Sequence, residues 1–233
     1  MTDDLGLGLE PGEPHYRAFV GPPADYDLIC AMTFGLLTSL GLRQHHKVLD
    51  IGCGSLRIAR LLVPYLNQGG YTGIEPHQWL MDEGIAKEMG ADQIALKKPN
   101  LICADNAAVI AESEQFDFAF AQSIFSHTGT DLLDGWLRET SRVLKPTGAL
   151  AATFLIDSID APEQGWIYPG CVRFTPRTMA YFASKHGLEF HILGWRHPRQ
   201  TWGLFSKPGF DRSWFLSRDL CWNTYVDFGP KPA

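Results

Sequence analysis

A short run in the first half of the chain has the composition of a ligand-binding turn. The apolar stretch Val48–Ile51 is followed by two glycines, Gly52 and Gly54, and Asp50 lies two residues before the first of them. Glycine has no Cβ, so the chain can turn sharply here and a ligand can approach the main chain closely. A helix that begins after such a turn directs free N–H groups toward the ligand. The run therefore predicts a site for a charged small molecule.

The spacing of this run separates two classes of cofactor. A dinucleotide fingerprint, G-x-G-x-x-G, needs a third glycine where this chain has Arg57. That fingerprint also has no use for an acid two residues before its first glycine. Asp50 instead suits a ligand with a cationic head, such as the amino group and sulfonium of S-adenosylmethionine. The spacing thus favours S-adenosylmethionine over a nicotinamide dinucleotide.

Three more polar residues occupy comparable positions farther along the chain. Glu75, Asp105 and Gln122 each end or closely follow a short apolar run that we expect to be a strand. In an open parallel sheet, ligands bind outside the carboxyl ends of the strands. Carboxylates gathered there need a cationic or polyhydroxyl ligand to offset the cost of their burial. We therefore expect Asp50, Glu75 and Asp105 to face one ligand.

Several segments, taken in order, resemble the class I (Rossmann-like) S-adenosylmethionine-dependent methyltransferases over about residues 46–206. These segments are Asp50–Gly54, Tyr71–Glu75, Cys103–Asn106, Phe116–His127 and Leu144–Gly148. The resemblance implies that Asp50, Gly52 and Gly54 hold the methionine part of the cofactor. It also implies that Glu75 accepts hydrogen bonds from the two ribose hydroxyls and that Asp105 accepts one from the adenine amino group.

The segment that resembles the fourth-strand motif adds Gln122 to the expected cofactor residues and His127 as the catalytic candidate. His127 comes just past the strand, where the transferred methyl group should meet its acceptor. An imidazole with an ordinary pKa of about 6.5 suits the removal of a proton from a hydroxyl or an ammonium near neutral pH. The alternative is a polar loop that caps the next helix. Trp166 and Tyr168, in a long loop, are expected to form either an acceptor-pocket wall or a flap over the core.

Three runs look, more narrowly, like those of a bacterial branch that acts on small molecules: Gly52–Arg57, Gly73–Pro76 and Gln122–His127. One residue departs from the family pattern, because the family often has a third glycine or small residue at the position of Leu56. The path of the loop at this position is therefore left open by the sequence.

The rest of the chain must bring these residues to one edge of a sheet. Strand and helix signals alternate from residue 47 to about residue 206. We expect strands at 47–52, 71–75, 101–103, 116–122, 148–155, 188–195 and 201–205, and helices at 26–40, 56–66, 77–89, 131–143 and 176–186. The link between the last two strands is too short for a crossover helix, so they should form an antiparallel hairpin. The expected fold class is α/β, a doubly wound, seven-stranded, mostly parallel sheet with an antiparallel last strand.

Composition limits the partners and the compartment. The 233 residues carry a formal charge of −6, which offers no basic surface for a nucleic-acid backbone. The uncharged stretch at residues 28–42 is shorter than a bilayer requires, so we expect no membrane span. Five cysteines without a C-x-x-C pair, and no secretory signal, indicate a cytoplasmic protein with reduced thiols. The histidine spacing shows no zinc pattern, so we expect no metal.

We expect a single methyltransferase domain over residues 1–233. It would contain an N-terminal cap segment at 1–45, a Rossmann-like core at 46–206 and an aromatic C-terminal extension at 207–233, which could also form a homodimer contact. The resemblance implies an enzyme that methylates an oxygen or nitrogen of a small molecule. The alternatives are a nicotinamide-dependent oxidoreductase and a non-catalytic scaffold of the same fold.

Overall fold

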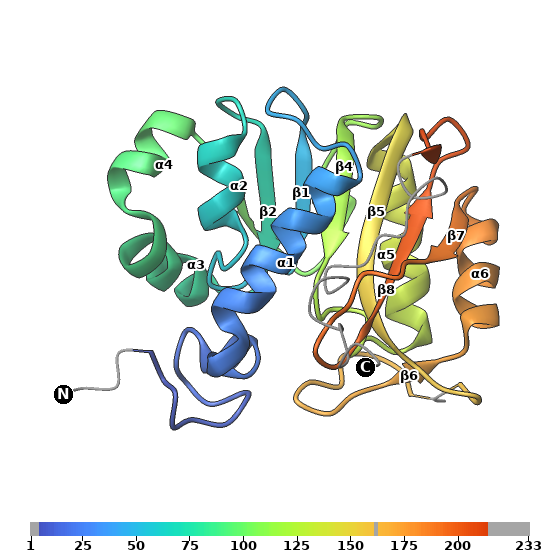
Figure 1. Ribbon diagram of the computed structural model, residues 1–233, viewed down its shortest axis with the longest axis horizontal. Coiled ribbons are helices and arrows are strands. Elements are labelled where there is room, and N and C mark those ends of the chain that lie inside the picture. Colours follow the sequence, from blue (N-terminus) through green and yellow to red (C-terminus); the bar gives the residue numbers. More distant parts are fainter. Residues whose placement is uncertain (1–4, 161–162, 214–233) are drawn as a thin grey trace, which may run out of the picture.

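A central sheet with helices on both faces organises the computed structural model, which describes residues 5–160 and 163–213 (Figure 1). The strands are β1 (Val48–Ile51), β2 (Tyr71–Glu75), β3 (Asn100–Cys103), β4 (Phe116–Ala121), β5 (Leu144–Ile156), β6 (Arg173–Phe174), β7 (Glu189–Ile192) and β8 (Thr201–Ser206). Their order is β3-β2-β1-β4-β5-β8-β7, and β6 pairs with the end of β5. β8 runs antiparallel to β5 and β7, whereas the other pairs are parallel. The predicted sheet with its antiparallel last strand is therefore confirmed, and β6 is a short addition.

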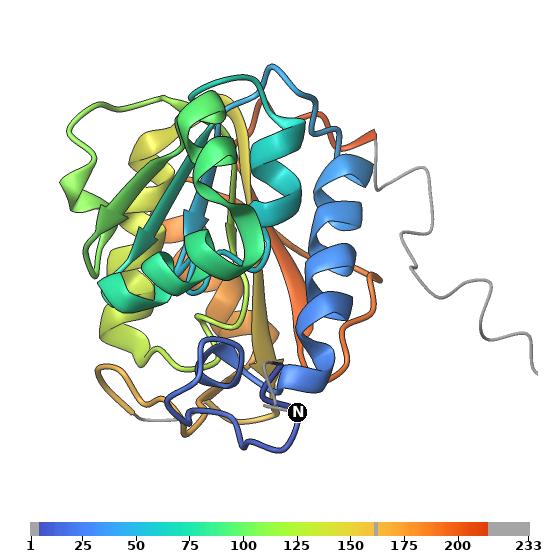
Figure 2. The same cartoon turned by 90° about the vertical axis from the view of Figure 1, so that its left-hand side faces the viewer.

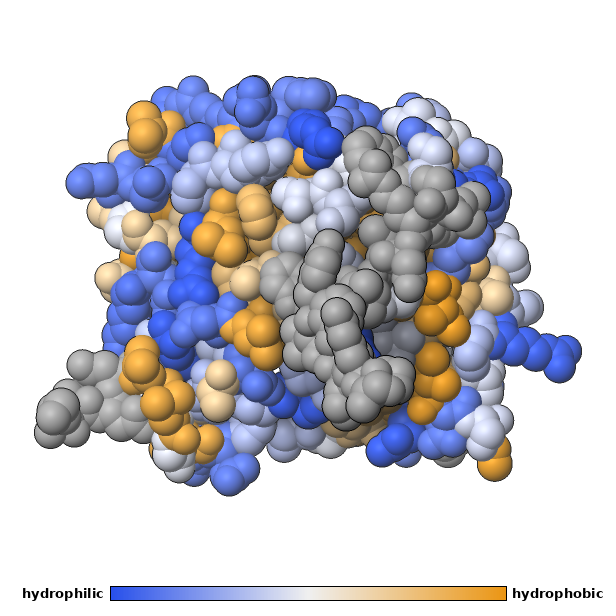
Figure 3. Space-filling view, in the orientation of Figure 1, coloured by the Kyte–Doolittle hydropathy of each residue, from blue (hydrophilic) through white to orange (hydrophobic). Residues whose placement is uncertain are grey.

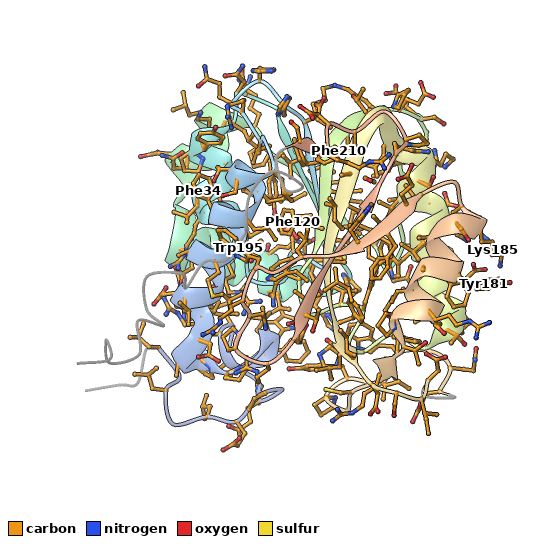
Figure 4. All side chains as sticks on the ribbon, turned by 45° about the vertical axis from the view of Figure 1, so that its right-hand side comes forward. Phe34, Phe120, Tyr181, Lys185, Trp195 and Phe210 are labelled. Atoms are coloured by element: carbon orange, nitrogen blue, oxygen red, sulfur yellow. The ribbon has the colours of Figure 1, made fainter. Side chains whose placement is uncertain are left out.

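The helices form a layer on each face of the sheet. They are α1 (Tyr26–Ser39), α2 (Ala59–Tyr65), α3 (Gln78–Gly84), α4 (Ala91–Lys97), α5 (Thr130–Val143) and α6 (Pro176–Lys185). Buried residues of α1, α2 and α3 form one hydrophobic cluster with the sheet, and those of α5 and α6 form another. Figure 2 shows α1 and α2 side by side in their layer. Phe120 and Trp195 lie in the first cluster with Phe34 packed against it, as Figure 4 shows.

The two-residue period of β1 decides where its acid points. Val48 belongs to the cluster under α1 and α2, whereas Leu49 and Ile51 belong to the cluster under α5. Side chains alternate between the faces of a strand, so Asp50 shares the face of Val48. Asp50 pairs in register with Gly73 of β2, and Glu75, two residues farther along β2, has the same facing. The register thus brings both acids to one face and one edge of the sheet.

The segments after β1 and β2 differ from the single helices predicted there. α2 begins at Ala59 rather than at residue 56, because Leu56 has a φ of +59° and lies in the preceding loop. The helix predicted at 77–89 divides into α3 and a π-helical turn, Ile85–Met89, which ends where the N–H of Gly90 donates to the carbonyl of Ile85. α4 has no counterpart among the predicted helices, since its seven residues are too few to display a helical period.

The expected C-terminal extension is described only as far as residue 213, and its remainder lies outside the described residues. Within the described part, Phe210 is buried and its ring centroid lies 6.1 Å from that of Phe118. Hydrophobic and hydrophilic residues are interspersed on the face shown in Figure 3. Among the described residues, no helix has both the length and the apolar character needed to cross a membrane.

Candidate functional site

The loop after β1 turns through three residues with positive φ. Gly52, Gly54 and Leu56 have φ values of +71°, +53° and +59°. The N–H groups of Gly52 and Cys53 donate to the carbonyl of Ile74 across 2.9 and 3.0 Å, which fixes the loop to β2. A leucine in this conformation costs about 1–2 kcal/mol, whereas glycine adopts it freely. Leu56 is fully buried, and its burial offsets the strain. The chain therefore takes at Leu56 the conformation that a third glycine would favour.

Close neighbours explain why the other two positions are glycines. A Cβ on Gly52 would lie 2.1 Å from Cδ1 of Ile124, and a Cβ on Gly54 would lie 2.7 Å from Cγ1 of Val20. Both contacts are made by the ends of apolar side chains rather than by backbone. A ligand that approaches the loop from this side must displace these two side chains, and no main-chain atom needs to move.

Asp50 is a buried acid at the end of β1. It is 1% exposed, and the hydroxyl of Tyr71 donates to its Oδ2 across 2.5 Å. Burial raises the pKa of Asp50 to about 7, although the Tyr71 hydrogen bond and the charge of Arg57 act in the opposite direction. A carboxyl group that is only partly ionised near neutral pH would gain ionisation from a cationic group placed beside it. The predicted preference of this position for a cationic head is thus consistent with its environment.

Glu75 links the end of β2 to the glycine loop. Its Oε2 accepts from the N–H of Gly54 across 3.1 Å, and its Oε1 accepts from the N–H and the Nδ1–H of His77 across 3.0 and 2.8 Å. A carboxylate offers about four lone-pair positions, so these bonds leave capacity for a further donor. The structure therefore brings Asp50, Glu75 and the loop together, as the sequence predicted.

Asp105 lies on the neighbouring strand end but makes fewer contacts. It follows β3, is exposed, and accepts from the side-chain amide of Asn106 across 2.6 Å. The N–H of Ala104 donates to the carbonyl of Glu75 across 3.2 Å, so Asp105 is one residue from a main-chain contact with Glu75. Its position is compatible with the expected adenine contact.

The side chain of Gln122 has different hydrogen-bond partners from those of Asp50, Glu75 and Asp105. Its Oε1 accepts from Nη2 of Arg57, and its Nε2 donates to Oγ of Ser123 across 2.7 Å. The same Nε2 lies 3.2 Å from Nε2 of His197. Gln200 completes the group, because its amide donates to Oγ of Ser123 across 3.0 Å. Gln122 therefore reaches the loop after β1 through Arg57, and among the described residues no hydrogen bond joins its side chain to Asp50 or Glu75.

His197 and Gln200 were missed in the sequence, although a signal for them exists. They lie in the link between β7 and β8. Because β7 runs parallel to β5, its carboxyl end must be at the same edge as those of the core strands. The predicted hairpin therefore already required its link to reach the ligand edge of the sheet.

His127 follows β4 and is held by the long loop after β5. Its Nδ1–H donates to the carbonyl of Gly170 across 2.6 Å, and its ring centroid lies 4.9 Å from that of Tyr168 and 5.8 Å from that of Trp166. Burial lowers the pKa of His127 below its ordinary value, and the Gly170 carbonyl only partly opposes this. The imidazole is therefore neutral at pH 7, with its proton on Nδ1 and a free lone pair on Nε2.

The N-terminal segment, residues 5–25, covers this edge of the sheet. The hydroxyl of Tyr168 donates to the carbonyl of Phe19 across 2.6 Å, and the Phe19 ring packs against His77 and Trp79 with centroids 5.1 and 5.3 Å apart. Figures 1 and 2 both place this dark blue segment next to the loop after β5. A cavity of about 500 Å³ opens between the segment and α3, lined by Pro14, His15, Tyr16, Trp79, Asp82, Glu83 and Lys87.

The sheet order and the loop at the end of β1 define a Rossmann-like α/β protein. Residues 48–148 match the family model described as a methyltransferase domain. The matched segment spans β1 to β4 and contains Asp50, Glu75, Asp105 and Gln122, so the comparison supports a methyltransferase that uses S-adenosylmethionine. The family match thus favours a methyltransferase over the alternative of a nicotinamide-dependent oxidoreductase.

Solved structures show the same fold at low sequence identity. Magnesium protoporphyrin IX methyltransferase from Synechocystis PCC 6803, with bound S-adenosylmethionine, is 12% identical over 79% of this chain and 81% of its own, with a TM-score of 0.59. An S-adenosylmethionine-dependent methyltransferase from Aquifex aeolicus is 16% identical over 74% and 87%, with a TM-score of 0.54. The [4+2]-cyclase SpnF is 21% identical over 71% and 60%, with a TM-score of 0.55. Because this fold also supports a cyclase, it does not identify the acceptor.

The residues at the edge of the sheet fit the cofactor. At Gly52 and Gly54 the main chain is covered by the flexible apolar side chains of Ile124 and Val20. The carboxylates of Asp50 and Glu75 lie on one face of the sheet beside this loop. These hydrogen-bond acceptors match a ligand with one cationic end and a pair of hydroxyls. Among the described residues, no group of three or more His, Cys, Asp or Glu side chains is arranged to hold a metal ion.

Proposed function

We propose that the protein transfers a methyl group to an oxygen or nitrogen atom of a small molecule. S-adenosylmethionine supplies the methyl group on a sulfonium. The observation that supports this most directly is the shared facing of Asp50 and Glu75 over a loop whose Gly54 N–H donates to Glu75 across 3.1 Å. In this proposal Asp50 balances the cationic end of the cofactor, Glu75 accepts from the ribose, and Asp105 accepts from the adenine.

The proposed acceptor end of the site is His127. With Nδ1–H bound to the Gly170 carbonyl, Nε2 is the nitrogen available to take a proton from the acceptor. Burial lowers the pKa of the ring, so at pH 7 it is neutral and its Nε2 lone pair can accept a proton. A base matters for acceptors whose proton must leave, and it contributes about 10²–10⁴ to the rate.

Two features support a small acceptor rather than a nucleic acid. The formal charge of the chain is −6, which opposes binding to a polyanion. The N-terminal segment and the loop after β5 also meet over the site, where the Tyr168 hydroxyl donates to the Phe19 carbonyl. A covered site of this kind suits a ligand that can be enclosed.

Replacement of Glu75 tests the cofactor assignment. Glu75→Ala should raise the dissociation constant for S-adenosylhomocysteine by about 10–100-fold, because it removes a charged hydrogen-bond partner worth about 1.5–3 kcal/mol. Isothermal titration calorimetry measures this. Asp117→Ala is the matched control: Asp117 also accepts from a backbone N–H, that of Lys47 across 2.8 Å, but at the start of β4. Equal affinity in the wild type and Glu75→Ala would remove Glu75 from the cofactor site.

The catalytic part of the proposal needs a separate assay. A panel of hydroxylated and aminated metabolites, incubated with S-adenosylmethionine, should give release of S-adenosylhomocysteine with at least one member. NAD serves as the control ligand in the binding assay and should not bind. A protein that binds S-adenosylhomocysteine and shows no release across a broad panel would instead be the non-catalytic scaffold.

A further inference from the structure

Three arginines are buried or half-buried near the glycine loop, and only two of them have acidic partners. Nη2 of Arg17 lies 2.6 Å from Oε1 of Glu88, and Nη1 of Arg60 lies 3.0 Å from Oε2 of the same carboxylate. Both arginines also pair with Asp27. Arg57 is 7% exposed, and among the described residues no carboxylate lies within 4.0 Å of its guanidinium. A buried cation without an ionic partner is costly, so its retention calls for a physical reason.

The guanidinium of Arg57 has more donors than its surroundings use. Nη1 donates to the carbonyl of Val20 across 3.3 Å, Nη2 donates to Oε1 of Gln122, and Nε is buried without a partner. The ring of Tyr26 lies 5.6 Å away. Asp50 is near enough to feel the charge of Arg57 but forms no ion pair with it. The guanidinium is therefore hydrogen-bonded to neutral oxygens and not to a carboxylate.

A second excess of hydrogen-bond donors lies on the other side of Gln122, at His197. Its Nδ1 accepts from the N–H groups of Arg199 and Gln200 across 3.2 and 3.0 Å. Burial and the charges of Arg199 and Arg57 lower the pKa of His197 to about 4, so the ring is neutral and its one proton is on Nε2. That Nε2–H faces the amide nitrogen of Gln122, which is also a donor, at 3.2 Å.

Rotating the Gln122 amide does not remove the conflict. If its oxygen turned toward His197, its nitrogen would face Nη2 of Arg57, and donor would again meet donor. The cluster of Arg57, Gln122 and His197 thus lacks an acceptor in either orientation. A group with only acceptor atoms and a negative charge, such as a carboxylate or a phosphate, would satisfy it.

Gln122 and His197 lie in the half of the sheet away from the nucleoside acids, and Arg57 reaches Gln122 from the loop after β1. Gln122 follows β4, and His197 lies between β7 and β8, whereas Glu75 and Asp105 end β2 and β3. β1 separates Gln122 from Glu75, and β1, β4 and β5 separate His197 from Glu75. We infer that Arg57, Gln122 and His197 form an oxyanion site for a carboxylate or phosphate carried by the methyl acceptor. This inference rests on the proposed function and adds the class of acceptor to it.

The test uses the full-length protein saturated with S-adenosylhomocysteine, titrated with sodium phosphate and, separately, with sodium acetate. Chloride keeps the ionic strength constant. At least one of the two anions should raise the melting temperature in a saturable manner. Arg57→Gln should weaken that effect at least tenfold, because a neutral amide replaces the guanidinium. Arg57→Lys retains the charge and should restore part of the effect.

Controls separate this inference from the proposed function. Arg138→Gln removes an exposed arginine of α5 and should leave anion binding unchanged. Affinity for S-adenosylhomocysteine should change less than threefold in Arg57→Gln; a loss of more than tenfold would mean that Arg57 holds the carboxylate of the cofactor and would overturn the inference. The inference would also be overturned if the wild-type protein bound S-adenosylhomocysteine and responded to neither anion. Failure of wild-type protein to bind S-adenosylhomocysteine would instead overturn the proposed function.

The ligand-free stability of Arg57→Gln gives an independent readout. A structural arginine would make this variant less stable, since removing it breaks two hydrogen bonds. If Arg57 instead serves ligand binding at a cost to stability, Arg57→Gln should be as stable as the wild type or more stable, because the variant no longer buries a charge. A melting temperature of Arg57→Gln well below that of the wild type would therefore contradict the inference.

Discussion

Asp50, at the end of β1, and Arg57, in the loop that follows it, are buried side chains of opposite charge that do not form an ion pair. Asp50 is held by the Tyr71 hydroxyl, and Arg57 is held by neutral oxygens. Both charges are expensive in the ligand-free protein. Each therefore indicates a ligand group of the opposite sign, a cation beside Asp50 and an anion beside Arg57. The residue pattern predicted the first of these, and contacts from distant segments were needed to find the second.

His127 carries the prediction for catalysis at the residue scale. His127→Ala should lower the turnover rate with an identified acceptor by about 10²–10⁴-fold and leave the affinity for S-adenosylhomocysteine unchanged. In the wild type the rate should fall on the acid side only below a pH of about 6.5, because burial lowers the pKa of His127. The measurement is a pH–rate profile, and His45→Ala, an exposed histidine before β1, is the control. Unchanged turnover in His127→Ala would assign the ring to packing.

At the scale of elements, an ion-pair network fixes the N-terminal segment to the core. Glu88, in the π-helical turn after α3, is 6% exposed at its side chain and binds Arg17 of the segment and Arg60 of α2. The Tyr16 hydroxyl also donates to Glu88 across 3.0 Å. The network thus joins the segment to two elements that flank the glycine loop. Its position explains how residues before the core can cover a site built by the core.

Glu88→Ala should destabilise the protein by about 3–5 kcal/mol, because it leaves Arg17 buried without its closest partner. The free energy of unfolding, measured with urea, checks this. Glu83→Ala is the matched control: Glu83 pairs with Lys87 across 2.9 Å, but both side chains are more than 40% exposed. It should cost less than about 0.5 kcal/mol. Similar losses in the two variants would show that the network does not hold the segment.

At the scale of the whole molecule, the sheet divides the site into two halves. The order β3-β2-β1-β4-β5-β8-β7 puts the three acids on one side of the boundary between β1 and β4, and Gln122, His127 and His197 on the other. A methyl group has to pass from a donor on one side to an acceptor on the other. The boundary between β1 and β4, where the strand order reverses, is where parallel α/β sheets open a crevice for ligands.

The buried acid at this boundary makes global stability depend on pH. The pKa of Asp50 rises from 3.8 to about 7 on folding. The folded state therefore holds a proton that the unfolded state has lost between these values, and stability falls as the pH rises through that window. From pH 5 to pH 8 the wild type should lose about 2–3 kcal/mol that Asp50→Asn does not lose. Urea unfolding of both proteins at the two pH values measures this, and parallel profiles would contradict it.

The sequence alone predicted most of the strands and helices and the edge of the sheet at which we expect the cofactor. Alternating strand and helix signals required a mostly parallel sheet, and the acid and glycines at Asp50–Gly54 required a turn at one strand end, because these features depend on local spacing. The reversed last strand also followed from the short link before it. The path at Leu56 did not follow, since whether burial compensates a positive φ depends on the residues packed around it.

Only the tertiary structure decided which side chains share a site. Gln122 belongs with Arg57 and His197 rather than with the acids, and it lies 65 and 75 positions from them in the sequence. The same holds for the N-terminal segment, which reaches the loop after β5 through a hydrogen bond between Tyr168 and Phe19, 149 positions apart. Local pattern sets which backbone elements form, whereas contacts between distant segments depend on the register and packing of the complete sheet, and these set the charge balance of the site.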